Sequence, residues 1–239
     1  ILYIFIDNLE DLEFLNQELL SKPYLGVDTE FRRTTKHNMK LALLQINDAD
    51  EIYLIDTIRI SDPKEHASFL FSSSVKKIFH SCKEDIEAIY SWTNKKVTNI
   101  FDTQLANSFL GGEYSIGYQN LVEIKLGITL EKKETRSNWL RRPLTDAQLK
   151  YAALDVEYLI YLYIDQQKEL SKSAKAKWQE EDLLKMISIS LSQEDISKEK
   201  IRIISKNEES HILYKFNSVV EKISSDLRLN PTLFFSKKT

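Results

Sequence analysis

The stretch that indicates the fold runs from Tyr24 to Glu30 and reads YLGVDTE. It is a short apolar run that ends in Asp28-Thr29-Glu30, which predicts a strand with two carboxylates at its end. Alternate residues of a strand point to the same face, so Asp28 and Glu30 share one side of the sheet. Acidic side chains are seldom buried unless they are paired or bind a metal ion. Taken alone, an exposed strand end explains the pair equally well.

Another carboxylate, that of Asp155, lies in the segment from Lys150 to Asp155, which reads KYAALD. Tyr151 and Asp155 are four residues apart in a segment with a helical pattern, so they share one helix face. A buried tyrosine bonded to a helix aspartate is the structural explanation of this spacing. The surrounding sequence predicts one long helix from Asp146 to about Leu170, opened at Thr145.

Two more aspartates stand where a predicted strand gives way to a helix. Asp85 lies in the first turn of a helix predicted over residues 84–92, and Asp102 follows a strand predicted over residues 98–101. Each has a structural explanation, because acidic residues complement the helix dipole in the first turn and aspartate is a preferred N-cap.

Asp28, Glu30, Asp85 and Asp155, together with Tyr151, form a constellation in chain order. Hard oxygen ligands of this kind suit Mg²⁺ or Mn²⁺. Two such ions about 4 Å apart can activate a water molecule and stabilise the leaving oxygen of a phosphodiester. Because packed carboxylates repel one another without cations, the constellation predicts a two-metal site.

The remaining pattern predicts an α/β domain with a mixed sheet flanked by helices. The strands are expected at residues 1–6, 24–29, 41–46, 52–55, 75–79 and 98–101, and the earlier helices at 8–20, 63–71, 84–92 and 115–126. We expect residues 1–170 to form the main domain, residues 171–209 a helical linker, and residues 210–239 a further helical segment.

The amino-acid composition excludes several classes of protein. The 239 residues contain no apolar run of about 18 residues, so we expect no membrane span. The single cysteine, Cys82, excludes a disulfide framework and a multi-cysteine zinc site and fits the reducing cytoplasm. The net charge of −3 is unusual for a nucleic-acid binder. Basic residues gather in segments 31–40 and 131–150, which suits phosphate binding, although a solvated surface is the ordinary explanation of any one such run.

In combination, these motifs resemble the DEDD superfamily of 3′-5′ exonucleases, in its tyrosine-bearing (DEDDy) branch, and within that branch ribonuclease D. The matching stretches are Val27–Phe31, Leu43–Ile46, Phe79–Ile86, Phe101–Gln104, Ser137–Leu144 and Tyr151–Asp155. The resemblance implies a ribonuclease H-like (DnaQ-like) mixed sheet flanked by helices, followed by a helical C-terminal segment.

The resemblance also implies the roles of the acidic residues. Asp28 would bridge two divalent ions, Glu30 and Asp155 would complete the site of the ion that binds the attacking water, and Asp85 would hold the second ion. Tyr151 would position that water or help to deprotonate it. The sister branch uses a histidine one position upstream, where this chain has Lys150.

Contacts to the RNA 3′ end are implied in the same way. Thr29 and Phe31 would lie beside the terminal nucleotide. The candidates for its base, sugar or phosphate are Gln45, His80, Arg136, Trp139 and Arg142. A single-stranded 3′ tail calls for aromatic stacking and arginine–phosphate pairs. Structural explanations stay open, with Trp139 in the core and Arg142 in an ion pair.

The implied activity is a metal-dependent 3′-5′ exoribonuclease that trims RNA 3′ ends, such as those of tRNA precursors, and releases nucleoside 5′-monophosphates. Residues 214–237 resemble the start of an HRDC (helicase and ribonuclease D C-terminal) module, incomplete by that family's measure. We infer no obligate protein partner. Two alternatives stay open: an inert RNA-binding protein on the same fold, and a DNA or short-oligonucleotide exonuclease.

Overall fold

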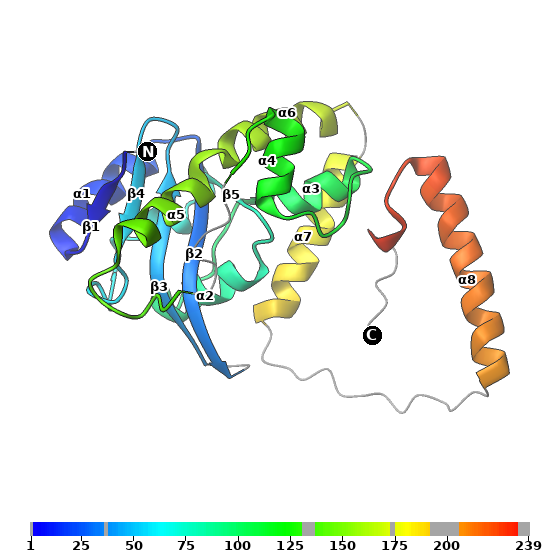
Figure 1. The fold of residues 1–239 in the computed structure, drawn as a ribbon, viewed down its shortest axis with the longest axis horizontal. Helices are drawn as coiled ribbons and strands as arrows, with labels where there is room; N and C mark the ends of the chain where they lie inside the picture. The colour runs from blue at the N-terminus through cyan, green and yellow to red at the C-terminus, as the bar shows by residue number, and fades with distance from the viewer. Residues whose placement is uncertain (1, 36–37, 131–136, 173–174, 192–205, 234–239) are drawn as a thin grey trace.

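The computed structural model of the protein describes residues 2–35, 38–130, 137–172, 175–191 and 206–233. These residues build a six-stranded sheet in the order β1-β4-β3-β2-β5-β6 with helices on both faces (Figure 1). The strands are β1 (Ile4–Ile6), β2 (Tyr24–Thr35), β3 (Asn38–Asn47), β4 (Ile52–Ile55), β5 (Lys76–Phe79) and β6 (Ile100–Asp102). The predicted α/β class with a mixed sheet is confirmed.

The helices follow the local signals in the sequence. They are α1 (Leu9–Leu20), α2 (Lys83–Thr93), α3 (Thr103–Phe109), α4 (Tyr118–Leu126), α5 (Asp146–Glu157), α6 (Leu159–Leu170), α7 (Lys175–Leu191) and α8 (Lys206–Leu227). Asn8 caps α1 by accepting the Asp11 N–H at 3.0 Å. Thr145 and Gln148 form a capping box that opens α5.

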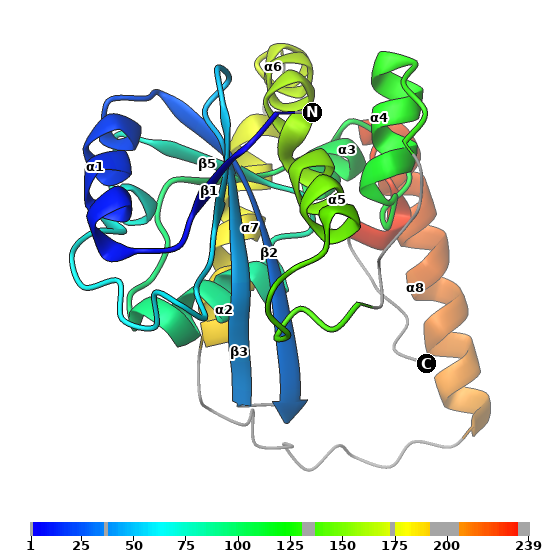
Figure 2. The ribbon, with the colours of Figure 1, turned by 60° about the vertical axis from the view of Figure 1, so that its left-hand side comes forward.

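The sheet topology places β5 beside the first part of β2. β2 pairs with β5 in parallel only over Tyr24–Gly26, whereas its antiparallel pairing with β3 continues to Thr35. β2 and β3 therefore run on past the other strands as a two-stranded ribbon (Figure 2). Asp28 and Glu30 lie where β2 leaves β5 behind, at the carboxyl end of β5, the edge at which α/β sheets usually bind ligands.

Two apolar layers cover the sheet. On one face, Leu25 and Val27 pack with residues of α1, α2 and α7. On the other face, Leu54 and Ile78 pack with residues of α5 and α6. This second layer is the one that carries α5, and hence Tyr151 and Asp155, across β2 (Figure 2).

The helix predicted over residues 63–71 is wrong. Only the 3₁₀ turn η1 (Ser68–Leu70) forms there. Lys64 adopts a left-handed conformation with φ 49°, which interrupts a helix directly after Pro63. The Phe69 N–H then donates to the Asn16 side chain of α1 at 3.1 Å, a bond that replaces the local helical one.

The single long helix predicted over residues 146–170 is also wrong, because it divides at Tyr158 into α5 and α6. Tyr158 has φ −106° and ψ 2°, outside the helical region. The sequence carries no proline or glycine at this point, so neither of the usual breakers causes the division. Its cause lies in contacts with distant residues, described with the site below.

The C-terminal helices differ in how they meet the domain. α7 packs against α2 and α3, with Leu183 buried in the layer that contains Val27. α8 stands to one side, and its burial is confined to its C-terminal half and the segment that follows, as at Val220, Ser224 and Leu229 (Figure 1). Of the predicted linker and HRDC-like segment, residues 173–174, 192–205 and 234–239 lie outside the described residues. Throughout the described ranges, no helix is long and apolar enough to cross a membrane.

Gly26 offers a test of this packing. A Cβ at Gly26 would lie 3.2 Å from Leu159 Cβ and 3.2 Å from the Val156 carbonyl oxygen, so Gly26→Ala pushes α5 and α6 off β2. We expect the free energy of unfolding, measured by urea denaturation, to fall by about 1–3 kcal/mol. Gly117→Ser is the matched control, because its side chain enters open space at the N-cap of α4. An equal loss in both variants would contradict the close approach at Gly26.

Candidate active site

Four carboxylates from three elements gather at the middle of β2, because the strand continues to Thr35 and does not end at the two acidic residues as predicted. Asp28 and Glu30 come from β2, Asp85 from the first turn of α2, and Asp155 from the last turn of α5. All three of the others act on Asp28, whose pKa is raised well above its ordinary value by burial and by repulsion from Asp85, Asp155 and Glu30. The structure thus brings together every acidic residue predicted for the site.

The pKa values of the other three carboxyl groups are also raised. Burial, followed by repulsion from Asp155 and Asp85, raises the pKa of Glu30 to about 9. Burial also raises the pKa of Asp85 and that of Asp155 to about 7 each. Shared burial of like charges is an arrangement that typically marks a functional site rather than a structural one.

Two side chains hold Asp85 at this position. The Thr29 hydroxyl donates a hydrogen bond of 2.5 Å to Asp85 Oδ1. The turn before α2 is fixed by Asp102, whose carboxylate accepts the backbone N–H groups of Ser81 at 3.1 Å and Cys82 at 2.8 Å. The same carboxylate caps α3, so the predicted N-cap role of Asp102 is confirmed.

Tyr151 stands one helix turn before Asp155 and bonds to its carboxylate. This hydrogen bond opposes the effect of burial on the Asp155 pKa. Burial and the negative charges of Asp155 and Glu30 raise the pKa of Tyr151, so its phenol is a neutral donor near neutral pH. The Tyr151 ring lies 6.2 Å from that of Trp139, which is itself buried in the layer beneath α5.

A divalent-metal site fits this donor set. Within the described ranges, no lysine, arginine or histidine forms a salt bridge with any of the four carboxylates. Gln45 lies opposite Asp28 on β3, is fully buried, and neither end of its amide has a hydrogen-bond partner among the described residues. Uncompensated carboxylates beside an unsatisfied amide suit a hydrated, hard cation.

The side chains are not already folded around one ion. In the ranges that the structure describes, no three His, Cys, Asp or Glu side chains converge on a single metal position. Like charges repel one another when no cation is present.

The residues predicted to contact the substrate lie in different environments in the structure. Thr29 is buried against Asp85, and Phe31 packs partly buried beside the layer that contains Val27. His80 has both ring nitrogens engaged, one with the Thr103 hydroxyl and one with the Ile116 carbonyl, each at 2.9 Å. Arg136 lies outside the described residues.

All five N–H groups of the Arg142 guanidinium donate hydrogen bonds within the protein. It forms a two-pronged pair with Asp56, at 2.6 Å from Nε and 2.7 Å from the terminal nitrogen. The remaining donors go to the carbonyl oxygens of Ala42, Trp139 and Arg141 at 2.6–2.9 Å. In this conformation, the guanidinium ties the loop before α5 to β3 and to the end of β4.

The break after Asp155 involves three residues that the sequence pattern did not single out. The Tyr118 hydroxyl accepts the Tyr158 N–H at 3.0 Å and donates to the Leu154 carbonyl at 3.1 Å. The Asn47 amide donates to the carbonyl groups of Val156 and Glu157, each at 3.1 Å. Gly26 lets the same turn approach β2 closely. Each partner is 36 or more residues away from the break, so no local signal could have revealed them.

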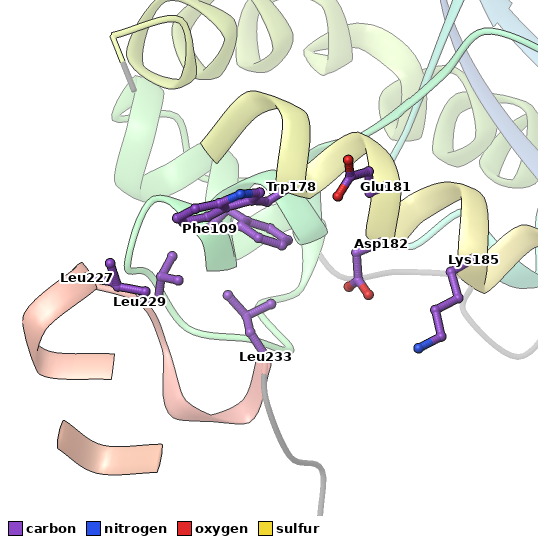
Figure 3. A pocket seen from close by; sticks show the side chains of 8 residues that line it. All are labelled: Phe109, Trp178, Glu181, Asp182, Lys185, Leu227, Leu229 and Leu233. Atoms are coloured by element: carbon purple, nitrogen blue, oxygen red, sulfur yellow. The ribbon is translucent and has the colours of Figure 1, made fainter. Parts of the chain in front are cut away.

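A pocket lies away from the carboxylate cluster. It opens between α3, α7 and the segment after α8, and its lining is Phe109, Trp178, Glu181, Asp182, Lys185, Leu227, Leu229 and Leu233 (Figure 3). None of these residues belongs to the carboxylate cluster. The pocket therefore marks where the C-terminal segment meets the domain.

A mixed sheet with carboxylates on β2, in α2 and in α5, beside a tyrosine, is the arrangement of the class of 3′-5′ exonuclease domains. The family model described as 3′-5′ exonuclease matches residues 3–171, and the chain belongs to this family.

Comparison with individual proteins confirms the predicted resemblance to ribonuclease D. Ribonuclease D of Pseudomonas paraeruginosa is 39% identical over 172 residues, which are 72% of this chain and 46% of that protein. Ribonuclease D of a Shewanella species is 35% identical over 199 residues, 83% of this chain and 51% of that protein. The chain thus spans about half the length of the curated relatives it matches.

Solved structures agree with these matches. The crystal structure of Escherichia coli RNase D superposes with a TM-score of 0.77 and 31% identity, over 80% of this chain and 51% of that one. Brucella melitensis NrnC shares the fold, with a TM-score of 0.70 and 22% identity over 85% of this chain and 98% of that one.

The raised pKa values predict an unusual pH dependence of stability. A carboxyl group whose folded pKa is raised stabilises the fold below its unfolded pKa of about 4, and this contribution is lost as the pH rises through the folded pKa. With folded values of about 7 for Asp85 and Asp155 and about 9 for Glu30, the Tm in EDTA should fall as the pH rises from about 6 to about 9. Calorimetry at several pH values measures this.

The control for this experiment is Glu30→Gln, which removes the carboxyl group whose pKa is raised to about 9 and should flatten the upper part of the curve. Added Mn²⁺ should raise the Tm most at the upper end of the range, where the carboxyl groups are ionised. A Tm in EDTA that stays constant over this range contradicts the clustering of the four groups.

Arg142 provides a second test. Arg142→Lys keeps the charge but cannot reproduce the forked pair with Asp56, so we expect the free energy of unfolding to fall by about 2–4 kcal/mol. Arg59→Lys is the matched control, because Arg59 lies beside the same aspartate but its side chain is 57% exposed. The loss there should stay below about 1 kcal/mol. Urea denaturation that gives equal losses would refute the structural role of Arg142.

Proposed function

We propose that this chain is a metal-dependent 3′-5′ exoribonuclease that trims RNA 3′ ends, including those of tRNA precursors, in the cytoplasm. One observation carries the proposal: four carboxylates share a site beside Tyr151, and none forms a salt bridge within the described ranges. Support for RNA as substrate comes from the Escherichia coli relative, whose structure is described as that of an exoribonuclease involved in structured RNA processing.

In this mechanism, Asp28, Glu30, Asp85 and Asp155 would hold two Mg²⁺ or Mn²⁺ ions. Such ions lower the pKa of a bound water and neutralise charge on the leaving oxygen. The four carboxylates must give up their protons to bind cations, so loading releases protons near neutral pH. Thr29 keeps Asp85 oriented through its 2.5 Å hydrogen bond.

Tyr151 acts as the neutral phenol that its raised pKa implies. Its hydroxyl, already bonded to Asp155, orients the attacking water toward the terminal phosphorus. The water oxygen bonds to that phosphorus, and the bond from phosphorus to the 3′ oxygen of the preceding nucleotide breaks. That oxygen takes up a proton, which leaves a nucleoside 5′-monophosphate and an RNA shortened by one nucleotide.

The nucleotide contacts follow from the position of β2. We propose that Thr29 and Phe31 flank the terminal nucleotide mainly through their backbone groups, because they lie next to Asp28 and Glu30 in the chain while their side chains point to the opposite face of the strand. Gln45 and Trp139 are buried, and His80 and Arg142 form hydrogen bonds within the protein. These environments favour a supporting role for the four side chains. Direct contact of these four with RNA stays a prediction.

The activity is tested with a 5′-labelled RNA that carries a single-stranded 3′ tail, incubated with Mg²⁺, Mn²⁺ or EDTA. We expect a ladder that shortens by one nucleotide at a time with either metal and stays intact in EDTA. Single-stranded DNA and dinucleotides serve as parallel substrates. RNA that is bound but never shortened would support the inert RNA-binding alternative, and faster cleavage of DNA or dinucleotides would favour the other one.

Variants of the cluster test the assigned roles. Asp28→Ala and Asp155→Ala should each lower kcat by more than about a hundredfold, because they remove proposed metal ligands. Tyr151→Phe should lower kcat by about a hundredfold and leave Mn²⁺ binding intact, since it removes only the hydroxyl. Asp50→Ala, at an exposed aspartate that pairs with Lys22, is the control. Turnover retained in Asp28→Ala or Asp155→Ala would overturn the proposed mechanism.

A further inference from the structure

The break between α5 and α6 begins three residues after Asp155, and the Tyr118 side chain enters it. In an uninterrupted helix the Tyr158 N–H would donate to the Leu154 carbonyl, four residues earlier. Here the Tyr118 hydroxyl stands between them, accepting from Tyr158 at 3.0 Å and donating to Leu154 at 3.1 Å. A side chain inserted into the hydrogen-bond ladder is a recognised cause of a sharp change in helix direction.

The inserted Tyr118 hydroxyl acts as a hydrogen-bond donor and as an acceptor at the same time. The phenol donates one hydrogen bond and accepts another, and phenylalanine at this position could do neither. The bond to Leu154 fixes the peptide that leads directly into Asp155. The phenol also lies close enough to the cluster that the charges of Asp155 and Asp28 contribute to raising its pKa.

Neighbours hold the Tyr118 ring in place. His80 meets it edge to face, with ring centroids 5.8 Å apart. The Ile116 carbonyl, two residues before Tyr118, accepts hydrogen bonds from His80 and from Gln104, each at 2.9 Å. His80 is therefore part of the support of Tyr118, which gives a reason for its engaged ring nitrogens.

Asn47 stabilises the same break from the other side. Its amide donates to the carbonyl groups of Val156 and Glu157, which lie in the last turn of α5, where helix carbonyl groups commonly need partners from outside the helix. Without the Tyr118 hydroxyl, the Tyr158 N–H can close on Leu154 directly. The last turn of α5 would then straighten and carry the Asp155 carboxylate with it.

We propose that Tyr118 is a positioning residue for Asp155, and that its hydroxyl sets the metal affinity of the cluster by keeping α5 and α6 apart. This inference rests on the proposed function, because it assigns Asp155 to the metal site. Groups that orient a metal ligand commonly change metal affinity or activity by about 10–100-fold when they are removed.

The test compares wild type, Tyr118→Phe and Tyr163→Phe. Tyr163 lies on α6, packs its ring against Phe101 and Tyr24, and forms no hydrogen bond through its hydroxyl with any described residue. Mn²⁺ affinity is measured by titration calorimetry without RNA, and kcat and KM are measured on the tailed RNA. We expect Tyr118→Phe to bind Mn²⁺ about tenfold more weakly, with a lower kcat and an unchanged KM. Tyr163→Phe should match wild type.

The outcomes separate the inference from the proposed function. Mn²⁺ affinity and kcat of Tyr118→Phe equal to those of wild type would overturn the inference. Wild type that neither binds Mn²⁺ nor cleaves RNA would overturn the proposed function, and with it the assignment of Asp155 on which the inference rests. Asn47→Leu, which releases the carbonyl groups of Val156 and Glu157, gives a second variant if Tyr118→Phe does not fold. It too should weaken Mn²⁺ binding, and unchanged binding there would count against the inference.

Discussion

The mutual repulsion of four carboxylates confined to one place is the constraint on which the rest of this structure depends. Asp28, Glu30, Asp85 and Asp155 are held together against both burial and like charge. Such a cluster lowers the stability of the metal-free fold at neutral pH, so it persists only because the surrounding scaffold over-determines it. A divalent cation relieves the repulsion, which links the strain of the fold to its proposed chemistry.

The scaffold meets this constraint with contacts that reach across the chain. Thr29 and Asp102 set the start of α2, and with it Asp85. Tyr118 and Asn47 set the end of α5, and with it Asp155. The parallel pairing of β2 with β5 brings the start of α2 to the strand that carries Asp28 and Glu30, and Gly26 lets the end of α5 approach the same strand. The four proposed ligands thus come from three elements, β2, α2 and α5, while the polar supports bind mainly to backbone groups.

The sequence was informative where structure is local. Alternation on the strand around Asp28, the spacing of Tyr151 and Asp155, and the caps at Asn8 and Thr145 are short-range signals, and all of them appear in the structure. The division of α5 from α6 could not be predicted, because residues 146–170 by themselves favour one helix. The hydroxyl of Tyr118, 40 residues away from Tyr158, enters the point where the helix is interrupted. The Arg142–Asp56 pair, 86 residues apart, escapes local pattern for the same reason.

The central claim is that the carboxylate cluster is a divalent-metal site, and the most direct measurement is anomalous scattering from crystals of this protein soaked in Mn²⁺. We expect anomalous density in contact with Asp28 and Asp155, and its loss in crystals of Asp28→Ala. The fold should remain unchanged in that variant. Saturating Mn²⁺ that leaves no density within the cluster, or density that persists without Asp28, would contradict the account.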